Sequence, residues 1–294
     1  MNIHAWWTAC RPNTLIVSIA PVLIGVSLSI HDDNFTSYLV GLLTLFSAIL
    51  IQIGTNFIND LYDFINGADT ENRLGPIRAT QSGLLSKKQI KIGAFLCFSL
   101  ALMMGIYLVY IGGLPILIIG LLSLICGYCY TAGPYPLAYH GLGDIFVFIF
   151  FGLVAVPGTY YLQNKILFDI DSVLIGSSIG FLAVAILCVN NIRDIDSDVK
   201  VGKKTLAVRF GKNKIILLYD AMLLCAYLSI LILIFKEGFY NQIEFLLLFL
   251  SFPVAIKLIF DVHQRSGKEL NLILGRTAIL LRTFSFLLII GLLI

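Results

Sequence analysis

The chain has 294 residues, of which 59% are hydrophobic and only 13% are charged, and its formal net charge is +3. This composition excludes an ordinary water-soluble domain and predicts a protein that crosses a membrane several times. So small a net charge gives no reason to expect nucleic acid as a partner.

Long apolar runs follow one another along the chain, and each is long enough to cross a bilayer as a helix of about 20 residues. Backbone amides cannot stay unpaired in lipid, so the runs are expected to be helices and the fold class all-α. Nine transmembrane helices are predicted at 14–30, 38–58, 91–110, 113–131, 142–162, 172–192, 214–235, 243–260 and 270–294. The first run has no clear cleavage site and is interpreted as a membrane helix rather than a signal peptide. A single intramembrane domain is therefore predicted over residues 1–294.

Basic residues are concentrated on one side of this arrangement. Nine spans place the N-terminus and the two longest connections, 59–90 and 193–213, on the same side. Fifteen of the 20 Lys and Arg residues lie on that side, whereas only Lys165 and Lys236 lie on the other. Because basic loops stay in the cytoplasm, the N-terminus and both long loops are predicted to be cytoplasmic, in a multi-pass protein of a bacterial inner membrane.

Both long connections begin with an Asp-rich cluster. The first contains Asn59, Asp60, Asp63 and Asp69, directly after the second span. A shift of 135 residues places Asn56 on Asn191, Asn59 on Asp194, Asp63 on Asp198 and Gly67 on Gly202. The sequence therefore predicts a pseudo-repeat with one Asp-rich cytoplasmic loop in each half.

The two clusters have the chemistry of a metal and phosphate site. Residues four apart share a helix face, which pairs Asn59 with Asp63 and Asp194 with Asp198. Converging carboxylates repel one another unless a cation joins them, and their oxygen atoms suit Mg²⁺, which commonly shares its ligand shell with substrate phosphates. Nearby basic side chains are expected to bind the phosphate oxygens. These predicted diphosphate-binding residues are Arg73, Arg78, Arg193, Lys203 and Lys204.

In these features the chain resembles the UbiA superfamily of intramembrane prenyltransferases, which have nine helices and two Asp-rich motifs. Within it the chain is most similar to the MenA type, which acts on 1,4-dihydroxy-2-naphthoate. The motifs that carry the resemblance are Arg11-Pro12-Asn-Thr14-Leu15, Asn59-Asp60-x-x-Asp63-x-x-x-Gly67-x-Asp69, Gly75-Pro76-x-Arg78-x-x-Gln81-Ser82-Gly83, Tyr130-Thr-Ala-Gly133-Pro134 and Asn190-Asn191-x-Arg193-Asp194-x-x-x-Asp198-x-x-x-Gly202-Lys203-x-Thr205-Leu206. Many members of the wider superfamily have an acid where this chain has Gly67, a departure shared with the MenA-like branch.

The resemblance implies a reaction. A polyprenyl group passes from polyprenyl diphosphate to 1,4-dihydroxy-2-naphthoate with loss of CO₂ and diphosphate, giving demethylmenaquinone, while the tail lies among the helices and membrane lipid. It implies Mg²⁺ ions held by Asn59, Asp63, Asp69, Asp194 and Asp198. Catalytic roles are implied for Asp60, Asp63, Asp194 and Asp198, and substrate contacts for Asn56, Gln81, Ser82, Tyr130 and Asn191.

Two other interpretations stay open at this stage. In the first, the protein is a prenyltransferase for another aromatic acid, such as 4-hydroxybenzoate or homogentisate. In the second, it is a divalent-cation transporter whose acidic side chains line an ion pathway. The second is disfavoured because no matching set of acids occurs on the opposite side. Arg276 and Arg282 interrupt the last span and are expected either to face a cavity or to extend to the membrane surface.

Overall fold

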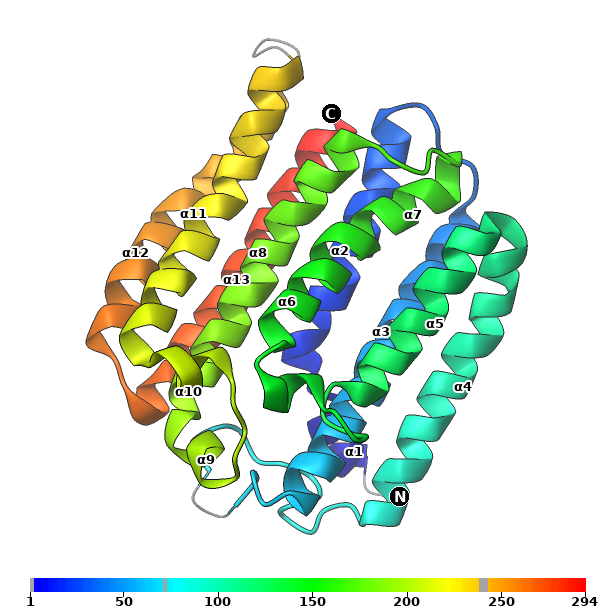
Figure 1. The fold of residues 1–294 in the computed structure, drawn as a ribbon. Helices are drawn as coiled ribbons and strands as arrows, with labels where there is room; N and C mark the ends of the chain where they lie inside the picture. Colours follow the sequence, from blue (N-terminus) through cyan, green and yellow to red (C-terminus); the bar gives the residue numbers. More distant parts are fainter. Residues whose placement is uncertain (1–2, 71–72, 238–242) are drawn as a thin grey trace.

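The computed structural model describes residues 3–70, 73–237 and 243–294, and within these ranges every regular element is a helix (Figure 1). Eight segments of this described part are long and apolar enough to cross a membrane. They are α2 (Pro12–His31), α3 (Tyr38–Ile65), α4 (Lys87–Gly112), the continuous α6 (Gly143–Phe148), η2 (Ile149–Val154) and α7 (Ala155–Asn164), α8 (Ile170–Arg193), α11 (Lys212–Glu237), η4 (Ile243–Ser251) with α12 (Phe252–Gln264), and α13 (Leu270–Leu293). A shorter apolar helix, α5 (Leu114–Cys129), matches the remaining predicted span, so the all-α membrane fold is confirmed.

The short elements gather at one end of the bundle. They are α1 (Ile3–Cys10), η1 (Leu137–His140), α9 (Ile195–Lys200), α10 (Leu206–Phe210) and η5 (Gly267–Glu269). In Figure 1 this end is at the bottom, where the loops after α3 and α8 also lie, while the C-terminus is at the top. The two Asp-rich loops therefore share one end of the bundle, as the number of spans predicted.

Polar residues set where the long helices begin. The hydroxyl of Ser37 accepts the Val40 N–H at the start of α3, and the Asp169 carboxylate accepts the Ser172 N–H at 2.6 Å at the start of α8. Such caps satisfy backbone groups that have no partner within the helix. With 28 residues, α3 is about 42 Å long, which exceeds the roughly 30 Å hydrocarbon core. Its last turns, which carry the first Asp-rich cluster, can therefore lie outside the lipid.

Two apolar clusters make up most of the core. The larger one centres on α8 and includes buried side chains of α2, α7, α11, α12 and α13. The smaller one joins α1, the last part of α3 and the start of α4. Each cluster carries one of the two Asp-rich loops, so the space between the clusters is where the loops face each other.

A close helix contact fixes one wall of that space. Gly152 lies in the π-helical segment η2 and packs on Gly176 and Gly180 of α8. A Cβ atom on Gly180 would lie only 2.8 Å from the Gly152 Cα. Small residues spaced four apart allow such approach between membrane helices. The contact holds η2 against α8.

Replacing Gly180 by Ala is expected to destabilise the protein by about 1–3 kcal/mol, because the added methyl meets backbone atoms that cannot rotate away. Thermal unfolding in detergent measures the change. Gly275→Ala is the matched control, since a Cβ atom at Gly275 of α13 meets nothing within 4 Å. Equal unfolding temperatures for the two variants would contradict the importance of the η2–α8 contact.

Candidate active site

A cavity of about 920 Å³ lies between the two apolar clusters. Its walls come from α1 to α9 and the loops between them, with Leu274 of α13. The end near the loops is polar, whereas residues such as Leu108, Ile116 and Leu162 line the far end. The volume is at the upper end of the range for small-molecule sites. An apolar channel closed by a polar end suits a ligand with a charged head and a hydrocarbon tail.

The pseudo-repeat predicted from the sequence is visible in the backbone of the two loops. Gly67 and Gly202 both adopt a left-handed conformation, with φ of 77° and 70°. The N–H of Ala68 donates to the Asp63 carbonyl at 2.8 Å, and the N–H of Lys203 donates to the Asp198 carbonyl at 2.9 Å. These pairs are related by the same shift of 135 residues. Glycine is required at both turns because an L side chain there is strained.

Lys203 lies between the two halves of the site. Its Nζ atom is 3.6 Å from the Asp63 carboxylate and 3.9 Å from the Asp198 carboxylate, so it contacts one acid from each loop. Tyr139, which lies in η1 before α6, donates its hydroxyl to Asp63 at 3.0 Å. The ammonium group thus joins the two acids that the repeat alignment pairs.

Burial and charge set the protonation of this group. Burial raises the pKa of Asp198 to about 7, and the charges of Asp194 and Asp63 add to the effect, although Lys203 and Arg73 oppose it. Burial alone would lower the pKa of Lys203, but the surrounding carboxylates outweigh it and raise that pKa. Lys203 is therefore charged at neutral pH.

Arg193 binds the side chain of the neighbouring Asp194. Its Nε and Nη2 atoms donate to the Asp194 carboxylate at 2.7 and 2.6 Å; Nη2 also donates to Asn190 at 2.7 Å, and Nη1 donates to Asn271 at 2.8 Å. Asn271 in turn donates to the Leu74 carbonyl at 2.8 Å. Asn271 on α13 thereby ties the end of α8 to the first loop.

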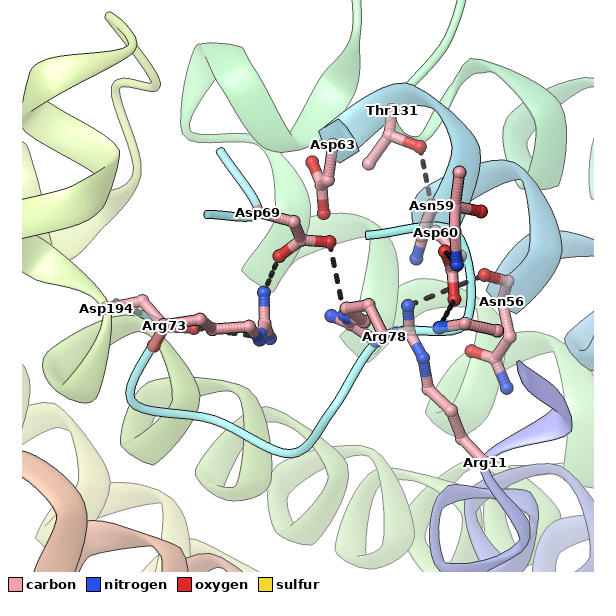
Figure 2. Close-up of polar contacts among 12 residues, drawn as sticks. Arg11, Asn56, Asn59, Asp60, Asp63, Asp69, Arg73, Arg78, Thr131 and Asp194 are labelled. Carbon is pink, nitrogen blue, oxygen red and sulfur yellow. Dashed lines mark hydrogen bonds and ion pairs between the residues drawn. The ribbon is translucent and has the colours of Figure 1, made fainter. Parts of the chain in front are cut away.

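Figure 2 shows a second ionic group, in the first loop. Asp69 forms ion pairs with Arg73 and, at 3.3 Å, with Arg78, and its side chain is fully buried. Arg73 also approaches Asp194 at 3.9 Å. Both carboxylate oxygens of Asp69 thus face arginines, and Asp69 orients these arginines at the cavity.

Asp60 holds the same loop in place through its backbone. Its carboxylate accepts the N–H groups of Ala79 and Thr80 at 3.0 and 2.9 Å and is only 1% exposed (Figure 2). Asp60→Asn is expected to loosen the loop, because an amide offers one acceptor oxygen where the carboxylate offers two, and hydrogen bonds to a charged group are worth about 1.5–3 kcal/mol each. Hydrogen exchange measures this as faster exchange at residues 79 and 80. Unchanged exchange in the folded variant would contradict this role.

The structure divides the predicted site residues into two sets. Those that line the cavity are Asn56, Asn59, Asp63, Arg73, Arg78, Tyr130, Asn191, Arg193, Asp194, Asp198 and Lys203. Those that do not are Asp60, Asp69, Gln81, Ser82 and Lys204. Ser82 and Lys204 are exposed, and Ser82 donates to the Arg78 carbonyl at 2.6 Å. The second set borders the site or supports it.

Several cavity residues were missed by the sequence analysis. Arg11 takes a left-handed conformation (φ 52°) before α2, and its side chain reaches the Asn56 carbonyl at 3.5 Å. Thr131 donates to Asn59 at 2.8 Å, and Asp144 lines the cavity from the start of α6. Arg11 belongs to a motif recognised in the sequence, whereas a single Asp in an apolar run gives no local signal.

The donor atoms fit a magnesium ion that is completed by substrate. Within the described ranges, no three His, Cys, Asp or Glu side chains are grouped closely enough to hold a metal alone. Mg²⁺, however, is often held by one or two carboxylates together with phosphate oxygens. Asp63 and Asp198 both line the cavity and offer such oxygens.

Neither arginine of the last span lines the cavity. Arg276 pairs with Asp261 of α12 at 3.0 Å, while Arg282 is exposed on the surface of α13. Of the two expectations for these residues, the cavity-facing one is wrong, because the cavity meets α13 only at Leu274.

The chain is similar in sequence to known prenyltransferases. Residues 18–275 match the UbiA prenyltransferase family. The 1,4-dihydroxy-2-naphthoate octaprenyltransferase of Haemophilus influenzae is 41% identical over 72% of this chain and 71% of its own length. The Bacillus subtilis protein of that name is 34% identical over 98% of this chain and 92% of its own length.

A solved structure shares the fold. It is that of a UbiA homolog from Archaeoglobus fulgidus bound to GPP and Mg²⁺, which matches with a TM-score of 0.65 over 99% of this chain and all of the other, at 19% identity. At this identity the likeness bears on the fold alone. Together with the family match and the bacterial relatives, it confirms the resemblance seen in the motifs: the chain belongs to the UbiA prenyltransferase family.

Proposed function

We propose that this protein transfers the polyprenyl group of a polyprenyl diphosphate to 1,4-dihydroxy-2-naphthoate, with loss of CO₂ and diphosphate, in menaquinone biosynthesis. The observation that carries the proposal is the position of Lys203, within 4 Å of one carboxylate from each loop, at the polar end of an apolar cavity. The names of the bacterial relatives support the choice of acceptor.

The diphosphate would lie at the polar end and the tail in the apolar channel. Mg²⁺ would be held by Asp63 and Asp198, with Asn59 and Asp194 beside them. It would stabilise the negative charge that develops on the leaving diphosphate. Lys203 and Arg73 would contact phosphate oxygens directly. Charge that builds up on the diphosphate as the carbon–oxygen bond breaks is thereby stabilised by groups already in place.

Other residues of the site would keep these groups in position. Arg193 orients Asp194, Asp69 orients Arg73 and Arg78, and Asp60 holds the loop that carries them. Arg78, which lines the cavity, would meet the diphosphate. Lys204 is exposed and would contribute only a general positive field.

The acceptor ring would lie between the diphosphate and the α5–α6 side of the cavity. Tyr130 at the end of α5, Asn56 of α3 and Asn191 of α8 line the cavity and would contact the ring or its substituents. Gln81 and Ser82, outside the cavity, would act on the acceptor only along its path of entry. Attack by a ring carbon on the prenyl group and loss of CO₂ would give demethylmenaquinone in its reduced, quinol form.

The two loops would face the cytoplasm of a bacterial cell, with the protein embedded in the inner membrane. The excess of Lys and Arg at the loop end supports this orientation. Residues 1–294 would act as one domain, since the cavity wall extends from Trp7 near the N-terminus to Leu274 of α13.

An acceptor panel tests the proposal. The purified protein in lipid vesicles receives octaprenyl diphosphate and Mg²⁺ with 1,4-dihydroxy-2-naphthoate, 4-hydroxybenzoate or homogentisate, and parallel samples contain EDTA. Prenylated naphthoquinol that forms only with metal is the expected product. Preferential turnover of another acceptor would reassign the substrate, and no turnover of any prenyl diphosphate by correctly inserted protein would refute the transferase.

A further inference from the structure

One buried carboxylate at the cavity takes no part in the diphosphate site. Asp144 is the second residue of α6, is 6% exposed and lines the cavity. In the described part of the chain no Lys or Arg is paired with it, and its side-chain contact is the Cys188 thiol at 4.0 Å. A buried acid without a basic partner is costly for the fold. Beside a cavity, such a group is a candidate for chemistry on a ligand.

Tyr130 places this acid next to the diphosphate site. A Cβ atom on Gly143 would lie 3.0 Å from the Tyr130 hydroxyl, so the start of α6 packs on that side chain. Tyr130 lines the same cavity as Asp144, Asp63 and Asp198. Asp144 therefore shares the cavity with the proposed diphosphate site, and Tyr130 packs against the start of its helix.

The loop before α6 fixes the relation between the two acids. The hydroxyl of Tyr139 in this loop donates to Asp63, and the N–H of Ala138 donates to the Tyr130 carbonyl at 2.9 Å. The N–H of Leu142 then donates to the Leu137 carbonyl at 3.0 Å, which closes the turn into α6. One short segment thus contacts Asp63 through Tyr139 and leads directly into the first turn of α6, which carries Asp144.

We propose that Asp144 is the general base for the aromatic acceptor and takes the proton from a ring hydroxyl as the new carbon–carbon bond forms. The inference rests on the proposed function. Removing the hydroxyl proton pushes electrons into the ring, so that the ring carbon that carries the carboxylate bonds to C1 of the prenyl group. The C1–oxygen bond breaks, and its electron pair leaves with the diphosphate. Departure of CO₂ returns an electron pair to the ring, and the proton held by Asp144 goes back to the same oxygen.

The acceptor class follows from this chemistry. It is a phenol whose hydroxyl reaches Asp144 while a ring carbon faces the donor, and its carboxylate is placed to leave. Tyr130, which packs on the start of α6 and lines the same cavity, would pack against the ring and set its orientation.

Asp144→Asn tests the proposal, because it keeps the size of the side chain and removes the base. At saturating donor and acceptor, kcat is expected to fall by about 100-fold or more, since a positioned base contributes roughly 10²–10⁴-fold. The donor KM and the rise in melting temperature on adding prenyl diphosphate should stay as in the unmodified protein. Asp220→Asn is the matched control, because Asp220 is a helical acid outside the cavity that pairs with His263.

An acceptor that is already ionised distinguishes a base from a structural residue. A ring-halogenated hydroxynaphthoate, whose hydroxyl is ionised at the assay pH, should recover most of the rate in Asp144→Asn, since no proton then has to be removed. Equal loss with both acceptors, or kcat within about 3-fold of the unmodified protein, would overturn the proposal. If prenyl diphosphate no longer raises the melting temperature of Asp144→Asn, the Asp144→Glu variant distinguishes the two roles. Retained turnover in Asp144→Glu supports a carboxylate base, and lost turnover refutes it. Failure of the unmodified protein with every phenolic acceptor would instead refute the proposed function itself.

Discussion

Replacing Asp198 by Asn is expected to lower prenyl transfer by about 1,000-fold. The Asp198 carboxylate is buried between Lys203 and the charges of Asp63 and Asp194. An amide of the same size cannot supply the negative charge that a divalent cation requires, and losing one preorganised electrostatic group typically costs 10²–10³-fold or more. Initial rates in vesicles at saturating donor, acceptor and Mg²⁺ measure the effect.

Asp196→Asn is the control for this change. Asp196 lies two residues earlier on α9, is exposed and does not line the cavity, so its variant should turn over within about 2-fold of the unmodified protein. Raising the Mg²⁺ concentration should restore little activity to Asp198→Asn, because the ligand itself is missing. Near-normal rates in that variant would mean that the second loop does not hold the reacting group.

Replacing Lys203 by Met is expected to reduce turnover by about 100-fold and to raise the donor KM. Its ammonium group neutralises Asp63 and Asp198 from one side and is placed to meet a phosphate oxygen. Without it, two buried acids face each other with no cation between them. Removing one partner of a buried ionic group typically costs 3–5 kcal/mol, so the variant should also melt at a lower temperature in the absence of metal.

Lys204→Met makes the same chemical change at the next residue, which is exposed and outside the cavity. It should leave both turnover and melting temperature nearly unchanged. If Lys204→Met instead impaired donor binding as strongly as Lys203→Met, the diphosphate would have to bind outside the cavity, and the assigned polar end would be wrong.

Much of the fold follows from patterns that the sequence displays directly. In the described ranges, hydropathy placed the eight membrane spans and the shorter apolar helix α5, and counting the predicted spans put both Asp-rich loops at one end, as observed. The repeat also predicted backbone geometry, since Gly67 and Gly202 form the same left-handed turn after equivalent acids. These features are periodic or local, and the residues that determine them are close together in the chain.

The sequence alone did not predict which role each acidic residue has. Asp60 and Asp63 are three residues apart in one motif, yet Asp63 faces the cavity while Asp60 binds the backbone of a loop. Asp69 has the position of a metal ligand, but the loop folds two arginines onto it. Which acid remains available depends on how the loop between α3 and α4 closes, and that depends on packing.

The sequence also did not predict the contacts between residues that are far apart in the chain. Asn271 of α13 reaches both Arg193 and the Leu74 carbonyl, which are far from it in sequence. Asp144 stands alone in an apolar run, and only the cavity relates it to Tyr130 and the two loops. A single polar residue in a membrane span marks a site only when its neighbours in space are known.

The most direct test is the stoichiometry of CO₂ release. Purified protein in lipid vesicles is given 1,4-dihydroxy-2-naphthoate labelled in its carboxyl carbon, a polyprenyl diphosphate and Mg²⁺, and labelled CO₂ and prenylated product are counted together. One CO₂ for each prenylated ring is expected from the unmodified protein, with both signals lost in Asp63→Ala and Asp198→Asn and kept in Asp196→Asn. Product formation that survives in both acid variants, or CO₂ release without prenyl transfer, would contradict a single site assembled from the two Asp-rich loops.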